Sequence, residues 1–194
     1  MNQRTRTFAA LAAALFLLAL TACGGSNFDG DFSYEVQDFS YVNQNSEKVS
    51  LDDLKGKPWL ADFVFTNCNT VCPPMTANMS RIQEKLKKEN IDMQIVSFSV
   101  DPEVDTPETL KAFGDKFDAD YDSWHFLTGY DQEEIVTLAR KSFKTLVQND
   151  PSSDQVIHGT SFYLVDQEGN AVKSYDGLDV PYEEIIDDAK AITK

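Results

Sequence analysis

The stretch FVFTNCNTVCPPM, residues 63–75, joins a run of large apolar side chains to two cysteines and two prolines. The apolar run begins at residue 59 and predicts a buried strand over residues 59–65. Prolines are typical of the first turn of a helix. Apolar residues then recur at helical spacing, at Met75, Met79, Ile82 and Leu86. The stretch therefore predicts a strand, a short loop and a helix over residues 73–90, with Cys68 and Cys72 at the junction.

The position of both cysteines near the start of a helix has chemical consequences. Exposed N–H groups at a helix N-terminus stabilise a thiolate and lower its pKa. Residues i and i+4 of a helical turn share a face, so the sulfurs of Cys68 and Cys72 can converge on one point. A disulfide and a shared metal ion are both compatible with this arrangement. A buried, inert pair of thiols is the third alternative.

The segments around this unit alternate between strands and helices. Polar and apolar side chains alternate around a turn in residues 32–51, which predicts an early β-hairpin. Further strands are predicted at residues 93–100, at residues 124–129 and on both sides of a turn at 168–170. Further helices are predicted at residues 105–117, 131–143 and 181–192, and a polar loop at 147–155. This order predicts an α/β sandwich in which helices flank a central mixed sheet.

The N-terminus has the pattern of an export signal. Arg4 and Arg6 precede an apolar run at residues 8–20, which is shorter than the roughly 20 residues that span a bilayer. The following LTAC resembles the lipobox of bacterial lipoproteins, and this resemblance implies lipidation of Cys23. An ordinary secretory signal with an incidental cysteine is the alternative.

This pattern divides the chain into three parts. We expect a lipoprotein signal peptide at residues 1–22, a flexible tether at 23–32 and one folded domain at 33–194. The expected location is the cell membrane, with the lipid-anchored domain on its extracytoplasmic side. In such an oxidising compartment, two thiols form a disulfide unless a ligand or a reductant intervenes.

The net charge argues against some classes of partner. The chain has a formal charge of -15 at pH 7. Such a surface repels phosphate backbones, so we expect no nucleic-acid partner. It also provides no electrostatic attraction to anionic lipid, so any membrane association would depend on the lipid anchor.

Metal binding by the two thiols would need further ligands. The chain has three cysteines and two histidines. If Cys23 is lipidated, a Cys₂His₂ zinc site remains conceivable in number, but the spacings do not match a zinc finger. Two thiolates and one imidazole suit copper. His158 is favoured over His125, because it lies where a long polar loop meets a buried strand, and functional residues are common at such loop ends.

Several motifs together resemble one known family. KGKPWLADFVFTNCNTVCP is similar to the thioredoxin superfamily, and especially to its Sco (SenC) group. The group's CxxxCP motif, its SxDPxxDTP-like segment and its WxFLTG segment occur here in the same order, and a histidine precedes a strand containing Tyr-Leu. They correspond to Cys68–Pro73, Ser99–Pro107, Trp124–Gly129 and His158.

The resemblance implies a thioredoxin-like fold and one copper ion, Cu(I) or Cu(II), bound by Cys68, Cys72 and His158. It also implies a metallochaperone that delivers copper to the Cu(A) centre of cytochrome c oxidase subunit II. Asp101 and Asp105 match the group's acidic loop, but from the sequence we expect turn formation and helix capping, with Asp105 or Thr106 as the cap.

A second function remains open at this point. The same cysteines would form a redox disulfide, so the protein could instead be a thiol:disulfide oxidoreductase that keeps the oxidase's copper-ligand cysteines reduced. Either role needs a thiol reductant outside the cytoplasm. A metallochaperone is not an enzyme and has no catalytic residues. Ordinary thioredoxins have a cis-proline where this chain has HGTS, and its absence argues against a general disulfide reductase. A third class, thiol peroxidases, needs a cysteine that neighbouring side chains activate, and the sequence shows no such group of residues.

Overall fold

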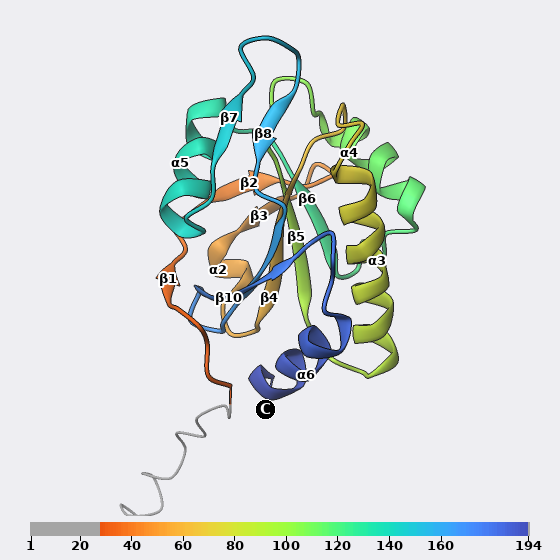
Figure 1. Cartoon of the computed structure of the whole chain (residues 1–194), viewed down its shortest axis with the longest axis vertical. Coiled ribbons are helices and arrows are strands. Elements are labelled where there is room, and N and C mark those ends of the chain that lie inside the picture. The colour runs from red at the N-terminus through yellow and green to blue at the C-terminus, as the bar shows by residue number, and fades with distance from the viewer. Residues whose placement is uncertain (1–27, 194) are drawn as a thin grey trace, which may run out of the picture.

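The buried strand β4 (Trp59–Val64) lies inside a six-stranded sheet whose order is β1-β10-β9-β4-β5-β6. The computed structural model describes residues 28–193 (Figure 1). Strands β5 (Gln94–Ser99) and β6 (Trp124–Leu127) run parallel to β4. On the other side of β4, β9 (Ser161–Val165), β10 (Asn170–Asp176) and β1 (Tyr34–Glu35) each pair antiparallel with the preceding strand. The predicted mixed sheet is confirmed.

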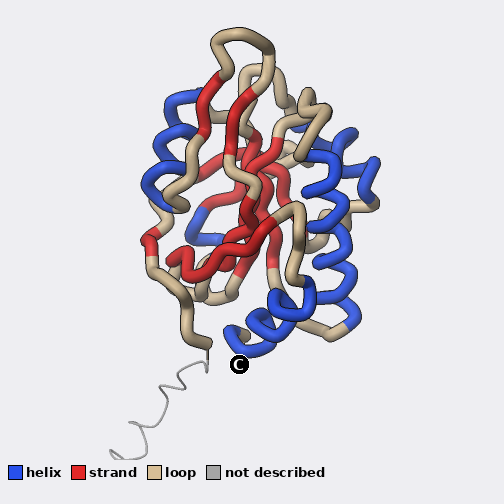
Figure 2. Tube along the Cα trace, viewed as in Figure 1, coloured by secondary structure: helices blue, strands red, loops and turns tan. Residues whose placement is uncertain are grey.

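Helices cover both faces of this sheet. Helices α3 (Cys72–Lys88) and α6 (Tyr182–Ile192) lie on one side and α5 (Gln132–Ser142) on the other (Figures 1 and 2). A shorter helix, α4 (Pro107–Gly114), continues into a 3₁₀ turn, η1 (Asp115–Phe117), and connects β5 to β6. One further turn of helix, α2 (Leu51–Leu54), precedes β4. The predicted sandwich is therefore present.

The core explains why these segments form these elements. All residues of β4 are buried, as its mostly apolar run predicts, because both of its faces are covered. Phe63 stacks on Phe98 with ring centroids 5.8 Å apart. On the opposite face, α3 buries the helically spaced residues Met75, Met79, Ile82 and Leu86. The two methionines are therefore part of the core.

Two small hairpins differ in how well the sequence predicts them. The early hairpin is confirmed as β2 (Ser40–Val42) paired with β3 (Lys48–Ser50). Residues 147–155 were predicted as a loop, but β7 (Val147–Asn149) pairs with β8 (Val156–His158). The loop prediction is wrong at its first three residues, because short strands rich in polar residues have no clear period.

The predictions for the N-terminus lie outside the described residues. The expected signal peptide, Cys23 and the first part of the tether fall within residues 1–27. Within residues 28–193, no helix combines the length and the apolar character that crossing a bilayer requires.

Candidate metal and redox site

Strand β4 and helix α3 place the two cysteines at one end of the sheet. The chain leaves β4 after Val64, passes through a short loop that contains Cys68, and enters α3 at Cys72. Prolines 73 and 74 occupy the first turn of α3 and have no N–H groups to satisfy. The N–H of Cys72 donates to Sγ of Cys68 over 3.3 Å. The sulfur of Cys68 therefore occupies the place of a cap at the positive end of the helix.

His158 completes the cluster from a different part of the chain. It is the last residue of β8, and its Nε2 lies 3.4 Å from Sγ of Cys72. Its Nδ1 lies 2.9 Å from the carbonyl oxygen of Gly159. A carbonyl only accepts, so Nδ1 carries a proton, and Nε2 is the ring nitrogen that faces the sulfur. The ring also packs edge-on against Phe65, 5.7 Å between centroids.

The two thiols are both buried but differ in acidity. Both are free thiols, with Cys68 4% exposed and Cys72 fully buried. Burial raises the pKa of the Cys68 thiol, but hydrogen bonds from His158, Cys72 and backbone N–H groups outweigh it and lower the pKa to about 5. Burial, followed by the neighbouring Cys68, raises the pKa of Cys72. Cys68 is therefore the reactive thiolate of the pair.

This donor set suits a soft transition metal. The two cysteine sulfurs and the imidazole of His158 lie together, and the contact of Nδ1 with the Gly159 carbonyl orients the ring so that Nε2 faces the sulfurs. Among the described residues, no group of three His, Cys, Asp or Glu side chains already has the geometry of a metal centre. Hydrogen bonds link the Cys68 sulfur to the N–H of Cys72 and the Cys72 sulfur to Nε2 of His158, and binding a metal would replace the contact between the Cys72 sulfur and His158 with coordination.

A buried carboxyl group lies on strand β4, ahead of the cysteine loop. Asp62 is fully buried and accepts a hydrogen bond from Ser97 Oγ at 2.5 Å, while its Oδ2 has no partner. Burial raises the pKa of Asp62 to about 7, although Ser97 and the nearby His158 act in the opposite direction. The sequence alone does not mark Asp62 as a residue near the site, because a single acidic residue in an apolar run only interrupts that run.

Asp105 does not play the capping role that was expected for it. Thr106 is the N-cap of α4, and its side chain accepts from the N–H of Thr109. Asp105 is instead 1% exposed and accepts hydrogen bonds from Thr66 and Ser99. The expectation of Thr106 as cap is confirmed, and the alternative of Asp105 as cap is wrong. The carboxylate faces the sheet end, where donors from the cysteine loop reach it.

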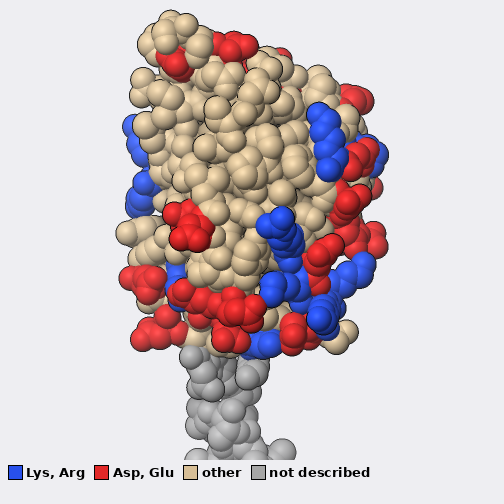
Figure 3. Space-filling model, turned by 45° about the vertical axis from the view of Figure 1, so that its right-hand side comes forward, with Lys and Arg blue, Asp and Glu red and all other residues tan. Residues whose placement is uncertain are grey.

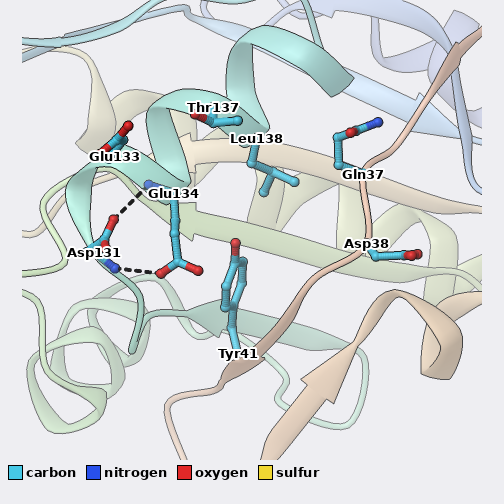
Figure 4. Close-up of a pocket in the computed structure, with 8 residues that line it drawn as sticks. All are labelled: Gln37, Asp38, Tyr41, Asp131, Glu133, Glu134, Thr137 and Leu138. Carbon is cyan, nitrogen blue, oxygen red and sulfur yellow. Dashed lines mark hydrogen bonds between the residues drawn. The ribbon is translucent and has the colours of Figure 1, made fainter.

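The remaining sequence candidates lie elsewhere. His125 is on β6, and its Nδ1 is 3.4 Å from Nδ2 of Asn43, with no contact to either cysteine. The cavity in Figure 4, of about 360 Å³, has several acidic side chains, but Asp131 and Glu134 form the capping box of α5. In Figure 3 the charged side chains gather on the lower part of the domain and around its edges, and a broad area above is free of them.

Comparison with known proteins identifies relatives over nearly the whole chain. The SCO1/SenC family matches residues 29–194. The chain is 52% identical over 182 residues to the SCO1 protein homolog of Bacillus subtilis (strain 168), which covers 93% of this chain and 94% of that protein.

Solved structures agree with this relationship. A SCO1/SenC family lipoprotein from Bacillus anthracis str. Ames is 50% identical, with a TM-score of 0.81 over 83% of this chain and 96% of that chain. BsSco, a member of the Sco family of cytochrome c oxidase assembly proteins in which a disulfide switch has been identified, is 51% identical, with a TM-score of 0.80 over 86% and 98%. Copper-bound ScoI of Bradyrhizobium japonicum is 28% identical, with a TM-score of 0.69 over 81% and 99%.

The resemblance seen in the sequence motifs is therefore confirmed at the level of the family and of its thioredoxin-like fold. The motif order, the mixed sheet and the relatives over nearly the full length point to the same group. The chain belongs to the SCO1/SenC family.

Proposed function

We propose that this protein is a copper metallochaperone that binds one copper ion through Cys68, Cys72 and His158. Its destination would be the Cu(A) centre in subunit II of cytochrome c oxidase. The observation that carries the proposal is the convergence of the three side chains, with Nε2 of His158 3.4 Å from Sγ of Cys72 and the Cys72 N–H on the sulfur of Cys68.

The relatives support the metal and the destination. ScoI of Bradyrhizobium japonicum has been solved with copper bound, and BsSco is a member of a family of cytochrome c oxidase assembly proteins. Thiolate sulfur and imidazole nitrogen are ligands that copper prefers over hard oxygen donors. The cargo would be Cu(I) or Cu(II), and a disulfide between Cys68 and Cys72 would release it, because only thiolates coordinate.

Competition for copper tests the three-ligand proposal. The reduced protein, titrated with Cu(I) against a chromogenic Cu(I) chelator, should bind one equivalent, and His158→Ala and Cys72→Ser should bind it far more weakly. His125→Ala is the matched control, because that ring does not touch the site. If His158→Ala bound Cu(I) as tightly as the parent protein, His158 would not be a copper ligand.

The acidity of Cys68 favours a second candidate function, a thiol:disulfide oxidoreductase that reduces the oxidase's copper-ligand cysteines. The Cys68 thiolate would attack one sulfur of the partner's disulfide, forming a mixed disulfide and releasing one partner thiolate. Cys72 would then attack Cys68 and release the second partner thiol. Two electrons pass to the partner, and this protein ends with a Cys68–Cys72 disulfide that an extracytoplasmic thiol reductant would reduce.

A copper-free assay separates the two functions. The protein is mixed with a disulfide peptide that contains the partner's copper-ligand cysteines, a chelator removes copper, and reduction of the peptide is measured. Repeated turnover in the presence of a thiol reductant would favour the oxidoreductase. No reduction of the peptide in this assay, together with binding of one equivalent of copper in the titration above, would favour the metallochaperone.

The proposed location also follows from the N-terminus. We propose that residues 1–22 are a lipoprotein signal peptide, that lipidated Cys23 anchors the protein to the cell membrane, and that a tether at 23–32 leads to an extracytoplasmic domain at 33–194. The relative from Bacillus anthracis is described as a lipoprotein. In Figure 1 the segment that leads into β1 and the β7–β8 hairpin lie at opposite ends of the domain, so the thiols would face away from the anchor. Cys23→Ser should move the protein from the membrane fraction to the soluble fraction.

A further inference from the structure

The loop that carries Cys68 is held to the protein interior at one buried point. The N–H of Thr66 donates to both oxygens of Asp105, at 3.2 and 3.3 Å, and its Oγ1 donates to Oδ1 at 2.5 Å. Thr66 precedes Cys68 by two residues, so these hydrogen bonds fix the backbone immediately before the reactive sulfur.

The buried carboxylate of Asp105 accepts most of its hydrogen bonds from the cysteine loop. The carboxylate is 1% exposed, and its one other donor is Ser99 Oγ at 2.6 Å on Oδ2. A buried carboxylate needs charge-assisted hydrogen bonds to offset the loss of hydration, and two of its three donor groups come from Thr66. Among the described residues no lysine, arginine or histidine makes an ion pair with Asp105.

The other contacts of the loop are weaker or exposed. The side chain of Asn67 donates to Asp154 Oδ2 at 2.9 Å, and its carbonyl accepts from Gln155 Nε2 at 3.3 Å, both at the surface. The Cys68 N–H donates to the carbonyl of Phe65 at 3.3 Å, a contact within the loop itself. Surface hydrogen bonds compete with water, so the buried carboxylate dominates the placement of the loop.

Asp105 is also tied to the neighbouring strands. Its carbonyl accepts from Thr128 Oγ1 at 2.7 Å, and Ser99 Oγ, its partner, accepts from the N–H of Asp101 at 3.1 Å. Ser99 ends β5, and Thr128 directly follows β6. Asp105, through its carboxylate and its backbone carbonyl, therefore connects the cysteine loop to the ends of two rigid strands, which is the arrangement that a precisely held ligand requires.

We propose that Asp105 is a positioning residue for Cys68, acting through Thr66, and that it sets the coordination geometry and the redox properties of the site. Of the measurements that test this inference, only those with copper rest on the proposed function. Groups that orient a metal ligand typically affect metal affinity by about 10- to 100-fold when they are removed. We therefore expect a loss of that size in Cu(I) affinity for variants that weaken the link between Asp105 and Thr66.

Four single variants and the Asp105→Asn/Thr66→Val double variant test the inference. Asp105→Asn keeps the shape but removes the charge, and Thr66→Val removes the hydroxyl donor, whereas Thr66→Ser retains it. Asp188→Asn is the matched stability control, because Asp188 lies on α6 and accepts from Lys173 and Tyr175, away from the thiols. Each is measured for Cu(I) affinity, for the thiolate-to-copper absorption of the Cu(II) form, for the midpoint potential of the Cys68–Cys72 couple and for thermal stability.

The expected result is a shared defect in Asp105→Asn and Thr66→Val. Both should bind Cu(I) about tenfold or more weakly and shift the absorption band and the midpoint potential, with a double variant that is little worse than either. Thr66→Ser and Asp188→Asn should match the parent protein in all site readouts. The inference would be overturned if Asp105→Asn and Thr66→Val kept the midpoint potential and the absorption spectrum of the parent protein and differed from it only in a lower melting temperature. If the parent protein binds no copper, the copper proposal fails, and the midpoint potentials still decide the role of Asp105.

Discussion

The acidity of Cys68 gives the sharpest test of the site's electrostatics. The opposing effects of burial and of hydrogen bonds from His158, Cys72 and backbone N–H groups leave its pKa at about 5. An ordinary cysteine has a pKa of about 8.5. At pH 7 Cys68 is therefore about 99% thiolate, against about 3% for an ordinary thiol, a difference of roughly 30-fold in the reactive form.

Alkylation measures this pKa directly. The reduced, copper-free protein is treated with iodoacetamide between pH 4 and pH 9, and mass spectrometry of peptides follows Cys68 separately from the other cysteines. The rate should be nearly constant above about pH 6 and fall about tenfold per pH unit below pH 5, because only the thiolate reacts.

Replacement of His158 shows where the acidity comes from. His158 is the foremost of the groups that lower the pKa of Cys68, so His158→Ala should move the inflection of the rate profile to higher pH. His125→Ala should leave the profile unchanged, because His125 contacts Asn43 instead. An inflection of the parent protein near pH 8.5, or the same profile in the His158 variant and the parent, would refute this description of the site.

Three further predictions concern stability. Burial raises the folded-state pKa of Asp62 to about 7, so the ionisation penalty is absent below pH 4 and complete above pH 7. Asp62→Asn should therefore gain about 2–4 kcal/mol over the parent protein in urea unfolding as the pH rises from 4 to 8, and a pH-independent difference would contradict the assignment. Phe98→Ala removes a fully buried ring and should cost about 3–5 kcal/mol in the same assay, whereas a cost below 1 kcal/mol would show that the core there is loosely packed. Gly129 has φ +85°, and a Cβ there would lie 2.8 Å from Val42 Cγ2, so Gly129→Ala should lose about 1–3 kcal/mol; an unchanged melting curve would show that Val42 yields freely.

The strand and helix around the cysteines were predictable because each has a strong local pattern. The apolar run of β4 reflects burial on both faces, and the spacing of the α3 side chains reflects a single buried stripe. The short strands β7 and β8 were partly missed, since each has three residues and is held by its partner rather than by a pattern of its own.

The site was only partly visible in the sequence for a similar reason. The spacing of Cys68 and Cys72 defines a local pair, but the contact with His158 depends on the fold of the β7–β8 hairpin. Asp105 looked like a helix cap, since an acidic residue before a proline-led helix is typical of one. One of its two actual partners, Thr66, is 39 residues away, a separation that no local pattern encodes.

X-ray absorption spectroscopy at the copper edge tests the central claim most directly. The reduced protein loaded with one equivalent of Cu(I) should show two sulfur scatterers and one imidazole nitrogen in its first shell. The imidazole contribution should disappear in His158→Ala and persist in His125→Ala. A parent spectrum without an imidazole, or one that His158→Ala leaves intact, would contradict the claim that Cys68, Cys72 and His158 together bind the metal.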